Sequence, residues 1–332
     1  MGKASQFIPA LKYGHKIYPE DMATPLTFSG KYWYVDKDNG SDTANTGRTI
    51  DKPKATIQAA ITAAGAHDVI FVKAANMAAG ATDPVSYAET LSIGPTQSGL
   101  SLIGINTGRA QGSLPQIKKG SGSTALLTIQ APGCLITGFG FNGGSSTGGG
   151  ILLDDDGSTK SAFGTSIIGN HFKNCVGSSA TNAATGGAIQ WASTGNAWQT
   201  HIAGNVFYKN VGDIVLLGTS GSVPQDVIIE DNEFLSASTS ATDANLFLSA
   251  GSGMSGLIIR NNAFGAVPAL GGGTNAKYLS LTGCYGAMTG NHFGSNGRTF
   301  GAAANELVPT TVFMAANYQE KSTSGSGEIF RT

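Results

Sequence analysis

Short apolar segments alternate with polar, glycine-rich segments along most of the chain, and five of them are followed by the same triplet, Asn-x-Phe. The pairs are Asn170/Phe172, Asn205/Phe207, Asn232/Phe234, Asn262/Phe264 and Asn291/Phe293. Successive pairs are 35, 27, 30 and 29 residues apart, and Phe141 lies 31 residues before the first phenylalanine. A period of about thirty residues is typical of folds built from stacked repeats.

Each repeat has room for three short strands and none for a helix. An apolar residue stands three positions before every asparagine, at Ile167, Ile202, Ile229, Ile259 and Met288. Each repeat also holds a second apolar run that follows a polar interval, namely GILLD, AIQWA, DIVLL, NLFLS and YLSLT. Such short runs, bounded by Gly and Ser, predict strands. Three strands per period predict an all-β fold, a single-stranded parallel β-helix in which each coil bonds to the coils above and below it.

The repeated triplet has a structural interpretation in that fold. Asparagine side chains stacked at the strand spacing of about 4.8 Å can hydrogen-bond in a ladder and satisfy the backbone at a bend. The phenylalanines two residues later are expected to stack inside the coils. The apolar residues three positions before each asparagine are expected to form an inward row.

The rest of the chain divides around these coils. Residues 1–30 are predicted to be an extended anchoring arm, and residues 31–66 to hold a first strand and a capping helix. Pro53 suits the first turn of that helix, and Ile57, Ala60, Ile61 and Ala64 fall on one face. Residues 67–305 are expected to form the coils, and residues 306–332 a C-terminal cap with a flexible tail.

The amino-acid composition argues against several classes of function. Only 12% of the 332 residues are charged, the net charge is -1 and 48 residues are glycine, so the surface must consist largely of small polar residues. Without a run of Lys or Arg, nucleic-acid binding is not expected, and no apolar stretch predicts a membrane segment. The N-terminal segment MGKASQFIPALKYGHKIYPEDM lacks the apolar core of a signal peptide. Cys134, Cys175 and Cys284 have no metal-ligand spacing and are expected to be small buried side chains.

The N-terminal part of the repeat region resembles a known family. The segment YWYVDKDNGSDTANTGRTIDKPKATIQAAITAAG, followed by DVIFV and YAETLSI, is similar to the first module of the pectin-lyase-like right-handed β-helix superfamily. The resemblance covers residues 32 to about 300 and implies a right-handed coil. The superfamily includes pectate lyases, glycoside hydrolases, epimerases, adhesins, and spike and decoration proteins of tailed bacteriophages, so the fold does not select a function.

Enzymes of this superfamily work along one outer sheet face with carboxylates that act as acid and base or hold calcium. Strand alternation assigns Leu152, Gln190, Val215, Phe247 and Ser280 to that face, flanked by Ala188, Asp213, Asn245 and Tyr278. This row lacks the paired carboxylates of a glycosidase, so no catalytic set is predicted. Asp213 and Arg260 are the alternative catalytic residues. No cofactor is expected, and Asp154, Asp155 and Asp156 favour a solvated turn, with a calcium site as the alternative.

Other polar residues have mainly structural interpretations. Glu230 and Arg260 occupy the same position in successive repeats and predict an ion pair between coils. The histidines at 171, 201 and 292 are expected at the surface with no carboxylate to orient them. Trp198, in the longest repeat, is a candidate platform for stacking on a sugar.

Apolar residues on the outer sheet face predict an interface. Leu152, Val215, Phe247 and Tyr278 would form an exposed apolar stripe, and such stripes mark association surfaces. Phage proteins that resemble this chain form trimers, so a homotrimer is predicted. The arm carries Phe7, Tyr13, Tyr18 and Phe28 between prolines, a pattern that favours an extended segment lying on a partner.

Together these features predict a structural protein of a bacteriophage particle, of capsid decoration or spike type. It would be an oligomeric β-helix located in the virion, attached to other virion proteins through residues 1–30, and able to bind surface polysaccharide. The alternative is a polysaccharide lyase or glycoside hydrolase, with Asp154, Asp155, Asp156, Asp213 and Arg260 as its residues. A bacterial surface adhesin, which would be extracellular, is a third hypothesis.

Overall fold

The structure is a computed structural model. It describes residues 30–105, 112–119, 122–157, 161–179, 182–193, 197–218, 223–237, 244–248, 253–265, 277–294, 306–322 and 325–329. The predicted arm therefore lies outside the described residues, except for Gly30. No helix within the described ranges has the length and hydropathy needed to cross a membrane.

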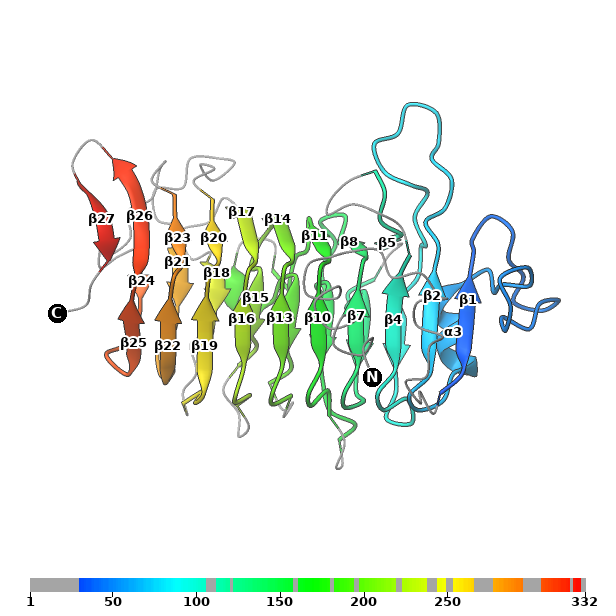
Figure 1. The fold of residues 1–332 in the computed structure, drawn as a ribbon, viewed down its shortest axis with the longest axis horizontal. Helices are drawn as coiled ribbons and strands as arrows, with labels where there is room; N and C mark the ends of the chain where they lie inside the picture. The colour runs from blue at the N-terminus through cyan, green and yellow to red at the C-terminus, as the bar shows by residue number, and fades with distance from the viewer. Residues whose placement is uncertain are drawn as a thin grey trace, which may run out of the picture.

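The described chain forms an elongated right-handed parallel β-helix whose successive coils lie side by side along the long axis (Figure 1). Most coils add one strand to each of three sheets, which contain ten, nine and eight strands among the described residues. The predicted fold class is confirmed. Because neighbouring strands pair in parallel and in register, a residue type that recurs once per coil is brought into a column.

The ten-stranded sheet consists of β1 (Tyr32–Val35), β2 (Val69–Val72), β4 (Ser101–Gly104), β7 (Leu135–Thr137), β10 (Ser166–Ile168), β13 (His201–Ala203), β16 (Ile228–Glu230), β19 (Leu257–Arg260), β22 (Gly286–Thr289) and β25 (Val312–Ala315). The nine-stranded sheet consists of β5 (Gln116–Lys118), β8 (Gly140–Asn142), β11 (His171–Lys173), β14 (Val206–Asn210), β17 (Glu233–Ala237), β20 (Ala263–Phe264), β23 (His292–Phe293), β26 (Asn317–Ser322) and β27 (Gly325–Ile329). The eight-stranded sheet consists of β3 (Leu91–Ile93), β6 (Leu127–Ile129), β9 (Ile151–Leu153), β12 (Ile189–Trp191), β15 (Ile214–Leu216), β18 (Ala244–Phe247), β21 (Lys277–Ser280) and β24 (Glu306–Leu307).

The predicted phenylalanine column runs through the interior. Six rings stack face to face with centroid separations of 4.7 to 5.2 Å and interplanar angles of 8 to 13°. The stacked rings belong to Phe141, Phe172, Phe207, Phe234, Phe264 and Phe293. All six are at most 1% exposed. The inward row of Ile167, Ile202, Ile229, Ile259 and Met288 is likewise fully buried, as predicted.

The asparagines form the predicted ladder at the corner between the ten-stranded and nine-stranded sheets. Asn232 shows the repeated pattern: its Nδ2 donates to the carbonyl oxygen of Ile202 and to Oδ1 of Asn262, each at 3.0 Å. The backbone N–H of Asn232 also donates to Oδ1 of Asn262, at 3.0 Å. Each side chain therefore satisfies a backbone N–H and a carbonyl of the preceding coil that the bend would leave without partners.

A left-handed residue precedes each asparagine and makes the sharp corner. Its φ is positive at Gly169, Gly204, Asp231, Asn261, Gly290 and Ala316, and Gly138, which precedes Phe139, has a positive φ at the same corner one coil earlier. Glycine, asparagine and aspartate adopt this conformation at the least cost. The corner therefore needs only two residues, which keeps the side chains on either side of it in strict register.

The N-terminal end is covered by helix α3 (Ile57–Ala63). Its N-cap is Thr56, whose hydroxyl accepts from the backbone N–H of Ala59, and Ile57, Ala60 and Ile61 are buried as predicted. The placement of Pro53 in the first turn is wrong, because this proline lies three residues before the N-cap. Asp42 explains the later start, since its carboxylate accepts from the backbone of Ala55 and Thr56 and holds them outside the helix.

The C-terminal end continues the coils beyond residue 305. β25 pairs in parallel with β22, and Asn317 extends the asparagine ladder by one coil. Gln319 occupies the position after Phe293 in the pairing register, so the phenylalanine column ends there. β26 and β27 then form an antiparallel pair, which corrects the prediction of a flexible tail for residues 325–329.

The three cysteines are buried and free, as expected from their spacing. Burial raises the pKa of each thiol to about 12, so each is protonated at neutral pH. They act as small apolar side chains in the core.

Candidate functional site

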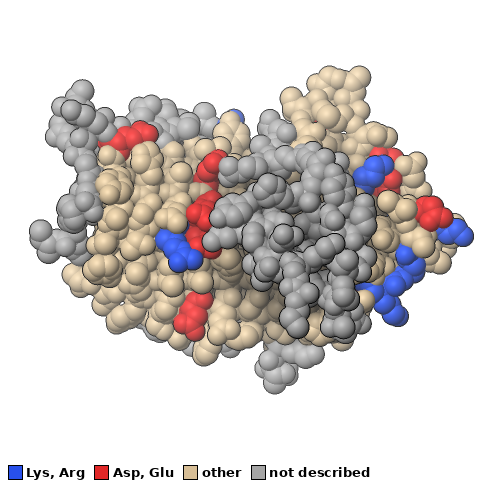
Figure 2. Space-filling view, viewed as in Figure 1, with Lys and Arg blue, Asp and Glu red and all other residues tan. Residues whose placement is uncertain are grey.

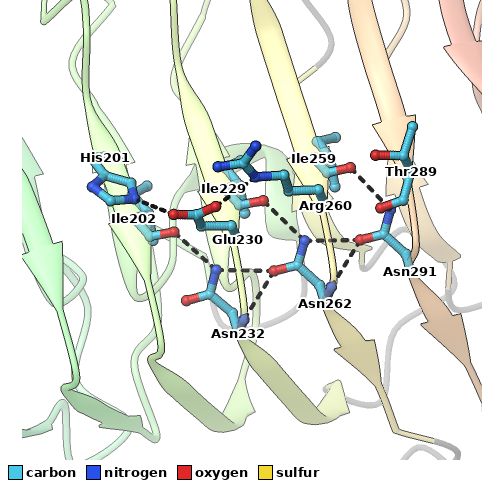
Figure 3. Close-up of polar contacts among 10 residues, drawn as sticks. All are labelled: His201, Ile202, Ile229, Glu230, Asn232, Ile259, Arg260, Asn262, Thr289 and Asn291. Atoms are coloured by element: carbon cyan, nitrogen blue, oxygen red, sulfur yellow. Dashed lines mark hydrogen bonds and ion pairs between the residues drawn. The ribbon is translucent and has the colours of Figure 1, made fainter. Parts of the chain in front are cut away.

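The best-defined polar cluster on the outer surface is a line of three side chains across neighbouring strands of the ten-stranded sheet. His201 begins β13, Glu230 ends β16 and Arg260 ends β19 (Figure 3). The strand register pairs Glu230 with Arg260 and with Ala203. The small alanine side chain leaves space above β13, and His201 reaches Glu230 diagonally across it.

Both carboxylate oxygens of Glu230 accept hydrogen bonds. Oε1 lies 2.9 Å from Nε2 of His201, and Oε2 accepts from Nε of Arg260 at 2.6 Å. The ion pair between Glu230 and Arg260 was predicted from the repeat. The expectation that no carboxylate orients His201 is wrong, because that prediction compared only residues at the same position in each repeat.

The two partners keep Glu230 ionised. Burial alone would raise the pKa of Glu230, but the hydrogen bonds and positive charge of Arg260, together with His201, lower that pKa below its ordinary value. The Glu230 side chain is 10% exposed, whereas those of His201 and Arg260 are 34% and 45% exposed. The line therefore presents accessible nitrogen groups around a shielded carboxylate.

This arrangement suits two roles, which are to join neighbouring coils and to bind a ligand. Each carboxylate oxygen can still accept a further hydrogen bond, but the lowered pKa of Glu230 makes it a weak base toward a substrate. The exposed Arg260 and His201 can donate hydrogen bonds to an oxygen-rich ligand. Among the described residues, no three His, Cys, Asp or Glu side chains come together in a way that could hold a metal ion.

The alternative catalytic pair is not assembled. Asp213 is 1% exposed rather than outward-facing, and its two oxygens accept from Nδ2 of Asn210 at 2.9 Å and Nδ2 of Asn245 at 2.6 Å. Arg260 belongs to a different sheet and contacts Glu230. Asp213 lies at the corner before β15, where consecutive residues face the interior, so simple alternation assigned it to the wrong side.

The three consecutive aspartates do not form a cation cluster. Asp155 Oδ1 accepts from the backbone N–H of Gly157 at 2.8 Å, which is a local turn, and Asp154 Oδ2 lies 3.4 Å from Nε2 of Gln130. A solvated turn was the favoured interpretation of residues 154–156, and the Asp155 contact is typical of one.

The predicted apolar stripe on the eight-stranded sheet is wrong in two of its four members. Leu152 and Phe247 are half-buried, but Val215 and Tyr278 are fully buried. The 3-10 helix η1 (Ala183–Thr185) packs against β15 and contributes to the cover over Val215. Tyr278 turns inward, where its ring meets Phe293 edge to face at 5.2 Å and its hydroxyl donates to the carbonyl of Gly294.

The remaining predicted positions are placed as follows. Trp198 is exposed, as a sugar-stacking residue must be. Phe7, Tyr13, Tyr18 and Phe28 lie outside the described residues, so their predicted role stays a prediction.

A buried cluster on the nine-stranded sheet was missed. His171 and Lys173 point outward from β11, and Lys173 Nζ forms an ion pair with Asp83 from the segment between β2 and β3. His171 is only 3% exposed and its Nδ1 has no hydrogen-bond partner, so its expected place at the surface is wrong. Burial, reinforced by Lys173, lowers the pKa of His171 to about 4. Asp83 lies outside the repeat period, and no signal in the sequence joins it to β11.

Few charges mark the described surface in the view of Figure 2, where uncharged residues cover most of it and charged side chains stand in small groups. This agrees with the 12% charged content of the sequence.

No family model and no curated protein matches the chain. Similar solved structures include the GH136 lacto-N-biosidase from Eubacterium ramulus, with 10% identity, a TM-score of 0.41, and coverage of 87% of this chain and 68% of that one. Pectate lyase Pel9A has 11% identity, a TM-score of 0.35, and coverage of 89% and 77%. The Dettilon tailspike protein has 14% identity, a TM-score of 0.29, and coverage of 76% and 55%. The strand pairing confirms the expected parallel β-helix fold.

Proposed function

We propose that the protein is a structural component of a bacteriophage particle, of capsid decoration or spike type, which binds glycans on its surface. The observation that carries this proposal is the internal architecture. The phenylalanine column runs through successive coils from Phe141 to Phe293, and the asparagine ladder runs from Asn170 to Asn317.

Such an interior favours a mechanical role. Each coil bonds to the next through three strands, a buried amide and a stacked ring, so bending the rod would break several contacts at once. A charge-poor surface limits long-range attraction and repulsion, which suits dense packing on a particle.

Attachment is proposed to occur through residues 1–30, and the assembly is proposed to be a homotrimer. The apolar stripe that was predicted on the eight-stranded sheet does not support self-association through that face, because Val215 and Tyr278 are buried. The mass in solution of the full chain and of a chain lacking residues 1–30 tests the role of the arm. A trimer that becomes a monomer on truncation supports self-association through the arm, and a monomer in both forms contradicts the homotrimer.

A polysaccharide-active enzyme is the second candidate. The alternative catalytic pair, Asp213 and Arg260, is not assembled. The support for an enzyme is instead the line of His201, Glu230 and Arg260, which contains ionisable groups on an accessible face. A panel of acidic and neutral polysaccharides incubated with the protein tests this candidate. New reducing or unsaturated ends that disappear in Glu230→Gln would favour it.

The structural role is tested by copurification. Antibodies against the protein should label purified phage particles from a producing strain, and the protein should sediment with those particles through a density gradient. Protein that stays entirely in the soluble fraction of such lysates would contradict the proposal.

A further inference from the structure

Two exposed aromatic rings occupy the same position in successive coils. Phe163 and Trp198 are 41% and 39% exposed. Both lie at the turn that leads from the eight-stranded sheet into the ten-stranded sheet, immediately before β10 and β13. The backbone N–H of Gly164 donates to the carbonyl of Trp198 at 2.7 Å, which fixes the two turns one above the other.

The turn forces these side chains outward. Each aromatic residue follows a fully buried alanine and precedes a residue with positive φ, which is Gly164 after Phe163 and Gln199 after Trp198. The conformation of these turns is further fixed by buried threonine hydroxyls. Thr165 Oγ1 donates to the carbonyl of Ala162 at 2.7 Å, and Thr200 Oγ1 donates to that of Ala197 at 2.8 Å. The rings are therefore displayed by a backbone that is ordered before any ligand binds, which reduces the entropy lost on binding.

The column continues into a polar residue on the next coil. The backbone N–H of Gln199 donates to the carbonyl of Gln225 at 2.8 Å, and Asp226 follows with a φ of 54° and an exposed side chain. Gln225 Oε1 accepts from Ser255 Oγ at 2.6 Å, so the amide is held in place. Along the rod axis the two rings are thus followed by the amide of Gln225, and the carboxylate of Asp226 belongs to the next residue of the same coil.

We propose that Phe163 and Trp198, with Gln225 and Asp226, form a binding platform for a neutral glycan chain that runs along the rod axis. Successive coils are separated by about 4.8 Å, a spacing comparable to the rise of one sugar unit in an extended glycan. Adjacent sugar rings can therefore lie over adjacent aromatic rings, and their hydroxyls can donate to Gln225 and Asp226. The carboxylate of Asp226 would repel a uronic acid, which selects neutral sugars. The inference deepens the glycan-binding part of the proposed function and rests on it.

The platform is tested with an array of immobilised neutral and uronic-acid-containing oligosaccharides, followed by fluorescence titration of the best neutral oligosaccharide. We expect the wild-type protein to bind neutral members, and Phe163→Ala and Trp198→Ala each to weaken that binding by about tenfold. Asp226→Asn should narrow the preference for neutral over acidic sugars. Phe313→Ala is the matched control, because it removes an aromatic ring that is 65% exposed on β25, and it should leave binding unchanged. Thermal unfolding of each variant shows whether the fold is retained.

Three results would overturn the inference: no neutral oligosaccharide bound, acidic members bound in preference, or binding that survives both Phe163→Ala and Trp198→Ala. The proposed structural role is judged separately, by sedimentation with phage particles. If the wild-type protein sediments with particles but binds no neutral oligosaccharide, the platform is refuted while the structural role stands.

Discussion

Asn232 and Asn262 are thirty residues apart in the sequence, yet Nδ2 of Asn232 donates to Oδ1 of Asn262 at 3.0 Å inside the protein. The same bond recurs between Asn205 and Asn232 and between Asn262 and Asn291, at 3.0 and 2.9 Å. The side-chain amide of Asn262 therefore bonds to groups of the preceding and the following coil, and these bonds keep successive corners in register.

Removing one rung should destabilise the stack at that coil. Asn262→Ala leaves the N–H and Nδ2 of Asn232 and the carbonyl of Ile229 without their partner. Because these groups are buried, we expect the free energy of unfolding to fall by about 3 kcal/mol. Urea-induced unfolding followed by circular dichroism measures the change. The control is Ala263→Asn at the exposed next position, and a loss as large as that of Asn262→Ala in this control would argue against the ladder.

The phenylalanine column predicts a comparable loss for a different reason. Phe234 stacks between Phe207 at 4.9 Å and Phe264 at 4.7 Å, and it is 1% exposed. Phe234→Ala should lower the free energy of unfolding by about 3 to 5 kcal/mol, because it leaves a cavity between two rings. Phe313→Ala, at an exposed ring, should change it by less than about 0.5 kcal/mol. Equal midpoints in guanidinium for the two variants would contradict the stacked interior.

The ion pair on the outer sheet face should depend on pH. The pKa of Glu230 in the folded protein lies below its ordinary value of 4.5. Its stabilising contribution is therefore fully present above that pH and is lost as the pH falls through the folded-state pKa. Glu230→Gln should unfold more easily than wild type at pH 7, by about 1 kcal/mol since Arg260 is partly exposed.

The difference between wild type and Glu230→Gln should vanish below the folded-state pKa. Unfolding measured from pH 7 to pH 3 tests this, with Glu320→Gln as the control at a half-exposed carboxylate. A difference in unfolding free energy that stays constant from pH 7 to pH 3 would exclude a role for the charge of Glu230.

The buried histidine predicts a second pH dependence at a higher range. The pKa of His171 is lowered from 6.5 to about 4. Between those values the unfolded chain binds a proton at this histidine that the folded chain does not, so stability falls by up to about 1.4 kcal/mol for each pH unit lost. His171→Leu should remove most of this slope, while His292→Leu, at an exposed histidine, should keep it. The proton resonances of the imidazole rings report the pKa directly, and a midpoint near 6.5 for His171 would contradict its burial.

The sequence predicted those parts of the fold that repeat. Asn-x-Phe recurs in five coils, so parallel pairing in register follows once the period is seen, and the ion pair of Glu230 with Arg260 follows from the same register. Asn317 was missed because the chain carries Tyr318 and Gln319 after it instead of the usual triplet.

The outer face was predicted less well, because alternation does not hold at the corners between sheets. Asp213 lies just before β15 and is bonded to the amides of Asn210 and Asn245, whereas Tyr278 lies near the start of β21 and its ring packs edge to face on Phe293. His171 and Lys173 are covered by a segment that lies outside the repeats, and only the folded chain brings Asp83 to them. Contacts between a coil and an irregular segment do not recur at a fixed spacing, so the repeat in the sequence does not predict them.

An experimental density map of the protein, by crystallography or electron cryo-microscopy, tests the central claim most directly. It should show the rings from Phe141 to Phe293 in one continuous column, with neighbouring centroids about 5 Å apart, and the asparagine amides in a parallel row at the corner. A map with these rings distributed among separate clusters, or with the asparagine side chains in solvent, would contradict the account.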